Sequence, residues 1–365
     1  MFSIFRRKPS PGPLTFNERV DAFWRWFQGV APRFYATIEA GNCSDLSAET
    51  SAKADELFPG FAWVFGPGEG GKGHSFTLTG EGNVHRQLLA LQWLSRAPAI
   101  TGWTFHAARQ PGPIKGHVIE IADMNFDPQE IWVTPRIDKE NEKIDLTVWH
   151  PAWERIEERQ RHTVTFLFLD EALGEYGTDW WIGEIKFGRD RLGDSFPLEE
   201  LADYVSASAE NCGWKKYPPG ESCALFSFKQ APGDFPRGDI RTQTTCVSRL
   251  VADFMNAAGE FDDPLAGSGA DYVYVSIAAS FFPPGDEVTR RGEIEEAVEA
   301  ALKKIQGGRW IGGALGTERG YCDFLIFDGK RSLTAIQKAL ASREVPAGTM
   351  IEFFAREKRG RRIAL

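Results

Sequence analysis

The last quarter of the chain, residues 271–356, limits the possible folds most, because its hydrophobic residues change spacing in a fixed order. Residues 272–279 are mostly β-branched, aromatic or small, and Pro283 follows them, which predicts a short buried strand. Residues 294–305 then place apolar side chains three and four positions apart, the spacing of one helix face. Gly307 is expected to end that helix, because glycine readily takes the left-handed conformation that closes helices.

The rest of this region predicts a hairpin, a second helix and a closing strand. Apolar runs at 310–315 and 321–327 flank a polar turn that contains glycine, which is typical of a β-hairpin. Ser332 is a good N-cap for a second helix, and residues 350–355 suit a final strand. The order strand–helix–strand–strand–helix–strand is that of a ferredoxin-like (βαββαβ) unit, with both helices on one face of a four-stranded antiparallel sheet. Many functions use this arrangement, so it indicates no chemistry by itself.

The remainder of the chain is predicted to form a second domain with its own sheet. Residues 1–14 contain three prolines and are interpreted as a flexible lead-in. Residues 15–190 mix helical and strand spacings, which predicts an N-terminal α+β domain with a mixed α/β sheet. Residues 191–270 either connect the two domains or extend the last one. Residues 271–365 are the predicted C-terminal ferredoxin-like domain with a basic tail.

Three local predictions concern the N-terminal domain. Asn17 is expected to cap the first helix. Residues 152–158 are expected to be helical. Residues 163–169, TVTFLFL, are mostly β-branched or aromatic and are expected to form a strand.

Charge and cysteine content limit the class of protein. The chain has 42 Lys and Arg against 51 Asp and Glu, a net charge of −9, so no nucleic-acid partner is expected. No apolar run approaches the roughly 20 residues of a membrane-spanning helix, so no transmembrane segment is expected. The five cysteines are scattered and form no Cys-x-x-Cys pair, which favours a reducing cytoplasm. No cofactor is expected.

The candidate catalytic residues are acids that follow the hydrophobic run at 163–169. Asp170, Glu171 and Glu175 lie where acids beyond the end of a strand can act as general acids, general bases or cation ligands. All six histidines lie in the first 162 residues, and His106 is taken as the candidate partner of these acids. The alternative is that the acids cap the next helix and keep a loop solvated.

One pair of residues has a spacing that metal ligands use. His150 and Glu154 lie one helical turn apart if the predicted helix begins early, which makes them candidate metal ligands. The alternative is a hydrogen-bonded or surface histidine, and no bound metal is expected.

Two further groups are candidate binding residues. Trp24 and Trp26, together with Phe27, form a larger aromatic patch than one helix face buries, so they are candidates for contact with a partner. Arg237 and Arg241 precede a predicted helix, and a helix N-terminus with a nearby arginine can hold an anion.

Several longer segments together resemble a known group of sequences. They are FWRWF near the start, WVFGPG with FTLTGEG, RAPAITGWTFHAAR, FLFLDEALGEYG, and ADYVYVSIAAS with GYCDFLIFD. They resemble uncharacterised bacterial proteins related to the family called domain of unknown function 695, over most of residues 16–356. The resemblance implies a cytoplasmic bacterial protein and carries over no catalytic residue.

Two function hypotheses follow. The first is a non-catalytic binding or regulatory protein, because no complete catalytic motif is present and a ferredoxin-like sheet can offer an open face to a protein partner. The second is a metal-assisted or acid/base hydrolase with its site in the N-terminal domain or at the domain junction. The sequence leans toward the first without deciding whether the protein is an enzyme, and it leaves the oligomeric state open.

Overall fold

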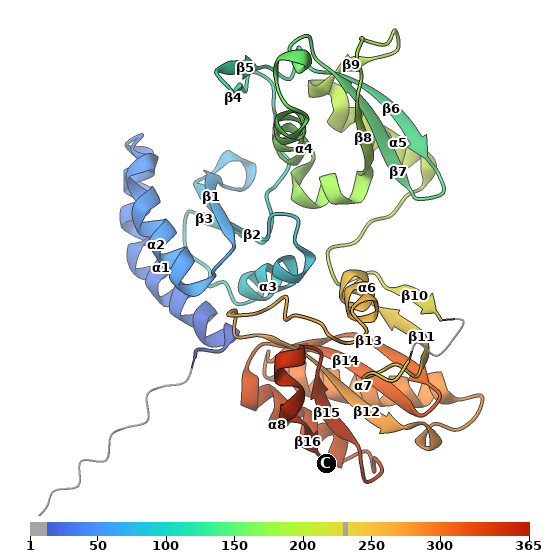
Figure 1. Cartoon of the computed structure of the whole chain (residues 1–365). Helices are drawn as coiled ribbons and strands as arrows, with labels where there is room; N and C mark the ends of the chain where they lie inside the picture. Colours follow the sequence, from blue (N-terminus) through green and yellow to red (C-terminus); the bar gives the residue numbers. More distant parts are fainter. Residues whose placement is uncertain (1–12, 229–232) are drawn as a thin grey trace, which may run out of the picture. The chain divides into compact units, whose positions relative to one another are not determined.

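A computed structural model describes residues 13–228 and 233–365. Most of the predicted lead-in, residues 1–12, lies outside the described residues. The protein is a mixed α+β protein with several separate sheets (Figure 1). It divides into two compact units. The C-terminal unit comprises Met1–Gly60, Ser95–Ile100 and Pro219–Leu365, and the middle unit comprises Phe61–Leu94 and Thr101–Pro218.

This division differs from the predicted ranges 15–190, 191–270 and 271–365. The first two helices, α1 (Phe16–Glu39) and α2 (Ser47–Leu57), belong to the same unit as the C-terminal sheet. The C-terminal unit is therefore built from both ends of the chain, which no local pattern in the sequence reveals.

The first turn of α1 shows how the N-terminal helix joins this unit. Asn17 is buried, its backbone amide donates to the Phe327 carbonyl (3.1 Å), and its side-chain amide donates to the Gln306 carbonyl (2.9 Å). The predicted cap was wrong by two positions. Thr15 caps α1, and Thr15 and Glu18 form a reciprocal capping box.

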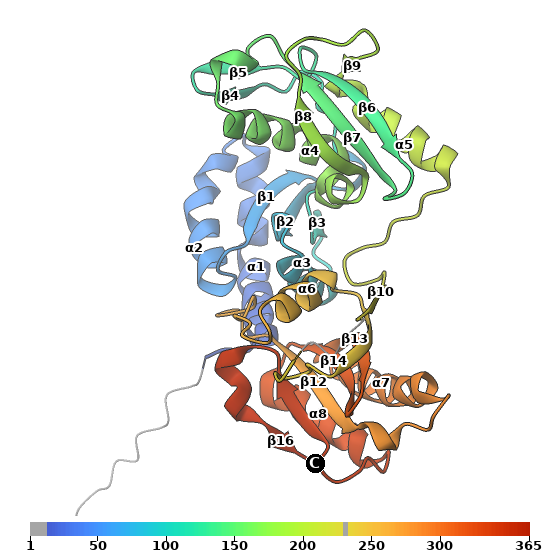
Figure 2. The ribbon, with the colours of Figure 1, turned by 45° about the vertical axis from the view of Figure 1, so that its right-hand side comes forward.

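The C-terminal unit contains a seven-stranded antiparallel sheet with the order β10-β11-β13-β14-β12-β15-β16. The strands are β10 (Ala224–Ser227), β11 (Ile240–Thr245), β12 (Asp271–Ala278), β13 (Gly308–Gly316), β14 (Arg319–Ile326), β15 (Met350–Phe353) and β16 (Ile363–Ala364). Figure 2 shows β12, β13 and β14 side by side. The predicted strands are present, but the expected sheet of four strands was too small, because β10 and β11 extend one edge and β16 the other.

Two helices cover one face of this sheet. They are α7 (Glu287–Lys304) and α8 (Gly329–Ala341). Val298 of α7 and Ile336 of α8 are buried in one core cluster with Val275 of β12. Alternation along β12 sends every second side chain into this core, as expected for a strand with a helix-covered face.

The opposite face of the sheet is also covered, by residues of the connecting segment. Helix α6 (Ser248–Asn256) places Phe254 against Phe354, with ring centroids 5.3 Å apart, and Phe354 in turn contacts Tyr274 of β12 at 5.2 Å. Tyr274 and Tyr321 are both buried. The sheet face that was expected to be open is therefore covered by other residues of the same chain, which pack around Tyr274 and Tyr321.

The middle unit has three small sheets and three helices. One sheet has the order β1-β2-β3, a second β8-β7-β6-β9, and β4 pairs with β5. The strands are β1 (Ala62–Pro67), β2 (His74–Thr79), β3 (Trp103–His106), β4 (Ile119–Ile121), β5 (Met124–Phe126), β6 (Trp132–Asp138), β7 (Lys143–Trp149), β8 (Ile182–Phe187) and β9 (Phe196–Pro197). The helices are α3 (Val84–Ser95), α4 (Glu158–Trp181) and α5 (Leu201–Cys212).

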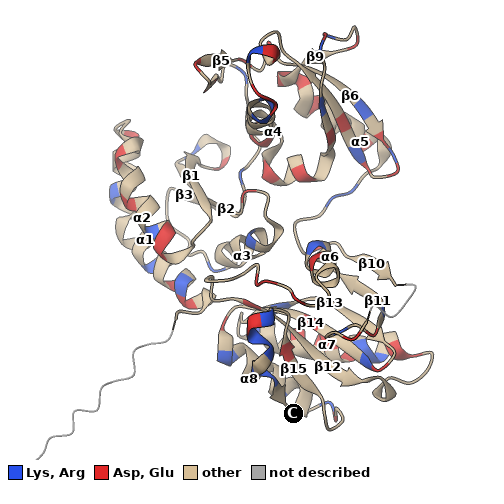
Figure 3. Ribbon diagram, in the orientation of Figure 1, with Lys and Arg blue, Asp and Glu red and all other residues tan. Residues whose placement is uncertain are grey.

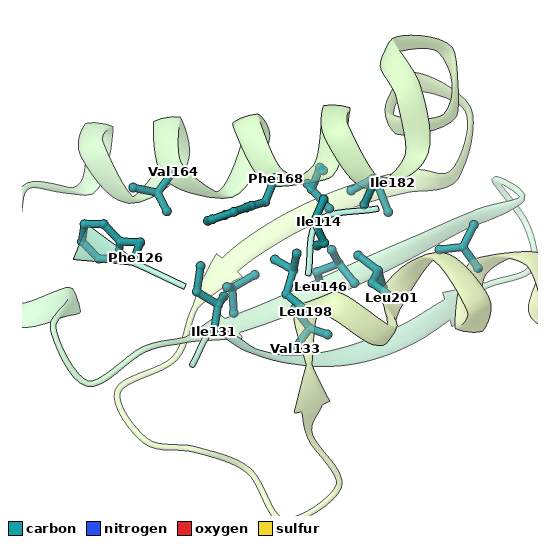
Figure 4. Close-up of a cluster of buried hydrophobic side chains, with 14 of the residues drawn as sticks. Ile114, Phe126, Ile131, Val133, Leu146, Val164, Phe168, Ile182, Leu198 and Leu201 are labelled. Atoms are coloured by element: carbon teal, nitrogen blue, oxygen red, sulfur yellow. The ribbon is translucent and has the colours of Figure 1, made fainter. Parts of the chain in front are cut away.

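The core of the middle unit lies between α4, α5 and the four-stranded sheet. Figure 4 shows Val164 and Phe168 of α4 pointing toward Val133 and Leu146 of the sheet, with Leu201 of α5 in the same cluster. These side chains are fully or almost fully buried. Burial of such apolar area at about 25 cal/mol per Å² is the main force that holds α4 on the sheet.

Two elements predicted near α4 differ in the structure. The expected strand at 163–169 lies inside this helix, and the expected helix at 152–158 is reduced to the short 3-10 turn η3 (Trp153–Arg155) before α4 begins. Gly174 interrupts α4 with φ 73° and ψ 163°, values outside the helical region. The helix therefore changes direction at Gly174, four residues after Asp170.

Among the described residues, no helix is both long enough and apolar enough to span a membrane.

Candidate active site

A cavity of about 660 Å³ lies in the middle unit. Part of its wall is apolar and part is polar or ionisable. The apolar lining is Val64, Phe65, Pro67, Pro111, Pro113, Ile119 and Leu167; the polar lining is Ser75, Thr77, His106, Arg109, Gln110, His117, Asp170 and Glu171; Gly66 and Gly112 complete it. Three of the four sequence candidates for catalysis, His106, Asp170 and Glu171, therefore line one cavity.

The helical conformation of α4 is what brings its two acids to the cavity. Leu167, Asp170 and Glu171 are spaced i, i+3 and i+4, so they share one face of the helix. Phe168 and Ala172 lie on the buried face. A strand would have sent Asp170 and Glu171 to opposite sides, so the helix is required for a site with both acids.

The break at Gly174 lets the segment before His117 pack tightly on α4. The Gly112 amide donates to the Glu171 carbonyl (2.7 Å), and the Glu175 amide donates to the Arg109 carbonyl (3.0 Å). A Cβ atom at Gly174 would lie 2.9 Å from the Arg109 carbonyl oxygen. Glycine is thus needed both for the positive φ and for the close approach of residues that line the cavity.

His117 and Glu171 form a dyad at the cavity. His117 Nδ1 lies 2.5 Å from Glu171 Oε1, and both side chains are partly exposed. When the Nδ1 proton is donated to Glu171, Nε2 keeps its lone pair and can accept a proton. A carboxylate that orients an imidazole in this way is a common general-base arrangement.

Asp170 is an acid with a strongly altered affinity for its proton. Burial raises its pKa to about 6, and the charges of Glu175 and Asp179 act in the same direction. The hydrogen bond from Thr178 and the charge of Arg109 oppose this shift. A carboxyl with a pKa near 6 exists in both protonation states close to neutral pH, which suits it for proton transfer.

His106, at the end of β3, has the opposite shift. Burial lowers its pKa, and the nearby charge of Glu69 only partly compensates. The imidazole is therefore predominantly neutral at pH 7, so it can donate or accept one hydrogen bond without a charge. The cavity combines a carboxyl that holds its proton more tightly than usual with an imidazole that holds its proton less tightly.

Glu175, the fourth catalytic candidate, has a structural environment. It is buried and does not line the cavity. Its carboxylate accepts hydrogen bonds from the Gly82 amide (3.0 Å), from Gln87 Nε2 (2.9 Å) and from the Thr79 hydroxyl. These bonds tie α4 to the turn after β2 and to α3, which explains a buried acid without a catalytic role.

The structure does not bring His150 and Glu154 into a metal site. His150 is buried between the rings of Phe126 and Trp153, at 5.1 and 5.2 Å, and burial lowers its pKa. Its Nδ1 accepts from the Ala152 amide (3.1 Å), while Glu154 is exposed in η3. Within 13–228 and 233–365, no group of three or more His, Cys, Asp and Glu could hold a metal ion.

The aromatic binding candidates are part of the packing of α1. Trp24 is buried, and it contacts Phe23 edge-on with centroids 5.1 Å apart. Trp26 is half-buried and contacts Phe23 at 5.5 Å and Phe34 at 5.8 Å. These contacts explain the aromatic patch as a cluster along α1 rather than as a free surface.

The arginine candidates have different environments. Arg237 is buried and forms a bidentate ion pair with Asp323, in which Nη2 donates to Oδ2 at 2.9 Å. Its guanidinium also lies over the rings of Tyr274, Tyr321 and Phe354, 4.7–4.8 Å from their centroids. Arg237 is thus held inside the C-terminal unit.

Arg241 is exposed on β11, and α6 begins at Ser248. The Thr245 hydroxyl accepts from the Val247 amide (3.0 Å) and donates to the Ile311 carbonyl (3.2 Å). Thr245 therefore stabilises the turn before α6 and does not cap the helix, because the N-cap is Val247 and no side chain caps it.

A smaller cavity of about 460 Å³ in the C-terminal unit lies beside Arg237 and Asp239. Its principal acid is already occupied, because Asp239 accepts from the Tyr321 hydroxyl (2.5 Å) and from the amides of Glu318 and Arg319 (both 3.0 Å). The described lining of this cavity also contains no histidine, in contrast to the cavity of the middle unit.

Most of the basic side chains of the C-terminal tail pair with acids of their own unit. Arg356 pairs with Asp262 (2.6 Å), and Lys358 pairs with Asp263 (2.5 Å) and with Asp271. Arg359–Glu260 and Arg362–Glu352 are further ion pairs. Figure 3 shows acidic and basic residues in both units. Four of the tail's basic side chains are thus held by acids, while Arg361 is exposed.

No protein-family model, curated protein or solved structure matches the chain.

Sequence reasoning missed two members of the cavity lining that matter chemically. His117 was not linked to Glu171, because the two lie 54 positions apart and no local spacing connects them. Arg109 was likewise not recognised, although its segment packs directly on α4 through backbone hydrogen bonds. Only the register of α4 and its break at Gly174 place these residues together.

Proposed function

We propose that the cavity of the middle unit is the catalytic site of an acid/base hydrolase that acts on a small, partly apolar molecule. One observation carries the proposal: Asp170, Glu171, His106 and His117 line the same cavity. Convergence of ionisable groups in a cavity supports a functional site, and the pKa values of two of them, Asp170 and His106, are shifted.

The roles follow from the contacts. His117, oriented by Glu171, is the general base that takes a proton from the attacking water. Asp170 is the general acid that gives a proton to the leaving group, which its raised pKa supports. His106 donates a hydrogen bond to the substrate as a neutral imidazole.

Arg109 is the cationic group of the site. It lines the cavity, and its Nη2 donates to Glu81 at 2.7 Å. The guanidinium has five N–H donors, so this ion pair leaves others for a negatively charged oxygen of the substrate or of the transition state.

The size and lining of the cavity indicate the class of substrate. A volume of about 660 Å³ is within the range of roughly 300–1,000 Å³ that is common for small-molecule sites. Val64 and Leu167 have 40% and 39% of their surface exposed, and both line the cavity. They would bind an apolar part of the substrate while the ionisable groups act on its polar bond.

The acid/base form of the hydrolase is favoured over the metal-assisted form. A catalytic zinc site uses three protein ligands, and the described ranges contain no cluster of three potential ligands. The proposal therefore assigns activation of water to the His117–Glu171 dyad.

Hydrolysis of a panel of 4-nitrophenyl carboxylic esters, glycosides and phosphates tests the proposal. The wild type should hydrolyse one class, and Glu171→Gln should lose that activity. Glu158→Gln is the matched control, because Glu158 is an exposed acid on the same helix. Equal rates for wild type and Glu171→Gln on every substrate would reject the proposed role.

Non-catalytic binding is the second candidate, and the apolar lining of the same cavity favours it. In that case a ligand would bind the wild type and stay chemically unchanged, and Glu171→Gln would alter affinity alone. Calorimetry followed by mass spectrometry of the recovered ligand separates binding from turnover.

Three further assignments stay proposals. The arrangement β12-α7-β13-β14-α8-β15, with the strand order β13-β14-β12-β15, supports a ferredoxin-like unit within the larger sheet. The segments quoted above support a relation to the domain of unknown function 695. A cytoplasmic bacterial setting is a prediction of that resemblance.

A further inference from the structure

Two cysteines that are distant in sequence meet at an edge of the seven-stranded sheet. Cys223 immediately precedes β10, Cys246 immediately follows β11, and their Sγ atoms lie 2.7 Å apart. Neither is bonded in a disulfide. They belong to the C-terminal unit and take no part in the cavity described above.

The strand register explains why the two thiols meet. β10 and β11 are antiparallel, and the Phe228 amide donates to the Arg241 carbonyl (2.8 Å), so that facing pair is hydrogen-bonded. Hydrogen-bonded and non-hydrogen-bonded pairs alternate along two antiparallel strands. Cys223 and Cys246 face each other five positions from the Phe228–Arg241 pair in the same register, so they form a non-hydrogen-bonded pair. Such pairs have Cα atoms about 4.5 Å apart, within the range of about 4.4–6.8 Å that a disulfide spans.

We propose that Cys223 and Cys246 form a thiol–disulfide exchange site that takes a small-molecule disulfide such as oxidised glutathione as its oxidant. The Cys223 thiolate attacks one sulfur of the oxidant, forms a mixed disulfide and releases one thiolate, which takes up a proton. Cys246 then loses its proton to solvent and attacks Cys223 Sγ, which forms the Cys223–Cys246 bond and releases the second thiol. The two protein thiols lose two electrons and two protons, and the oxidant gains them.

Exposure assigns the order of attack. Cys223 is exposed beside the edge strand β10, where a soluble disulfide can reach it, whereas Cys246 is half-buried. Burial and the hydrogen bond with Cys223 raise the pKa of the Cys246 thiol. Cys246 is therefore the less reactive thiol toward a soluble oxidant, which leaves Cys223 to attack first and Cys246 to act second, as the resolving thiol.

Covalent exchange fits this pair better than metal binding does. A structural zinc site takes four ligands, and no third His, Cys, Asp or Glu joins these two sulfurs within the ranges that the structure covers. Two facing thiols are sufficient for a disulfide. The other cysteines, Cys43, Cys212 and Cys322, lack a facing thiol in the structure as described.

Thiol counting and peptide mapping test the proposal on the full chain. Reduced protein, freed of reductant, is incubated with oxidised glutathione and then analysed without further reduction. We expect loss of two of the five thiols, a peptide pair linked through Cys223 and Cys246, and two reduced glutathione molecules released per chain.

Single variants test the order of attack. Cys246→Ser should retain one glutathione on Cys223, because the resolving thiol is gone, and Cys223→Ser should retain none on Cys246. Cys212→Ser is the control and should form the same link as the wild type. Retention of all five thiols by the folded wild type, a link between other cysteines, or no glutathione on Cys246→Ser would overturn the proposal.

Discussion

His117 Nδ1 and Glu171 Oε1 lie 2.5 Å apart at the cavity of the middle unit. The two residues come from separate segments, a loop before β4 and the middle of α4. A contact of this length between an imidazole and a carboxylate fixes the orientation of the ring, as a general base requires. The arrangement depends on how α4 is held, and the first two predictions address that.

Glu175 is predicted to be structural. Glu175→Ala removes the acceptor of hydrogen bonds from Gly82, Gln87 and Thr79. The Thr79 hydroxyl, which is fully buried, then loses its acceptor, and Gln87 keeps only its hydrogen bond to Asp179 (3.2 Å). The free energy of unfolding should fall by about 2–3 kcal/mol. Urea unfolding followed by tryptophan fluorescence measures it. Glu158→Ala, at an exposed site, should change it by no more than about 0.5 kcal/mol, and equal effects of the two variants would contradict the assignment.

Gly174 is predicted to tolerate no side chain. Alanine there must adopt a positive φ and bring its Cβ 2.9 Å from both the Arg109 carbonyl and the Pro111 ring. We expect Gly174→Ala to destabilise the protein by about 1–3 kcal/mol. Gly292, inside α7, has open space around its Cβ position and an ordinary helical φ, so Gly292→Ala should stabilise the protein by about 0.5–1 kcal/mol. Thermal denaturation of both variants tests the prediction: Tm should fall for Gly174→Ala and rise for Gly292→Ala.

Asp170 should make the stability depend on pH. Its pKa is raised to about 6 in the folded state from an ordinary 3.8, so the folded protein binds the proton more tightly than the unfolded chain does. The contribution of Asp170 to the free energy of unfolding is therefore fully present below about pH 4 and is lost as pH rises through about 6. Asp170→Asn should match the wild type near pH 4 and be more stable at pH 8 by about 1–2 kcal/mol, a value reduced for the partial exposure of the carboxyl.

Urea unfolding at pH 4, 6 and 8 checks the prediction for Asp170. A stability difference between Asp170→Asn and the wild type that stays constant over this range would show that the proton affinity of Asp170 is unaltered by folding.

The Arg237–Asp323 pair gives a prediction for the C-terminal unit. Asp323→Ala leaves a buried guanidinium without its counter-charge and should cost about 3–5 kcal/mol of stability. The double variant Arg237→Met/Asp323→Leu should recover most of this loss, because both buried charges are gone. Urea unfolding of Arg237→Met, Asp323→Leu and the double variant completes a double-mutant cycle that measures the coupling, and a loss in the double variant equal to the sum of the two single losses would contradict the prediction.

The element order of the C-terminal region could be predicted because each element has its own local pattern. The strand expected at 272–279 is observed as Asp271–Ala278, and the helix expected at 294–305 overlaps Glu287–Lys304. The full sheet could not be predicted, since β10, β11 and β16 join it through pairing between distant segments.

The misassigned strand at 163–169 shows where local patterns are ambiguous. A short apolar run is compatible with a strand or with a buried helix. The structure resolves the pattern: Val164, Phe168 and Ala172 are buried at i, i+4 and i+8, while Phe166 and Leu167 are exposed. A longer stretch of sequence that includes Ala172 shows the helical spacing of the apolar residues and favours the helix.

The candidate site could be predicted in part. Asp170, Glu171 and His106 were named from the sequence and line the cavity, while Glu175 does not. The distinction depends on the helical register and on the break at Gly174, which is a tertiary feature. His117 could be found only from the fold.

The most direct measurement of the central claim is the pH dependence of kcat/KM for hydrolysis of an alkyl analogue of the best panel substrate, because an alkoxide, unlike 4-nitrophenolate, needs a proton from the general acid to leave. If Asp170 is the general acid, the rate should fall as pH rises above about 6, because the carboxyl must hold its proton. Asp170→Asn should lower kcat by roughly 10²–10⁴-fold, with KM changed little. No turnover of any panel member by the wild type, or wild-type rates for Asp170→Asn at every pH, would contradict the claim.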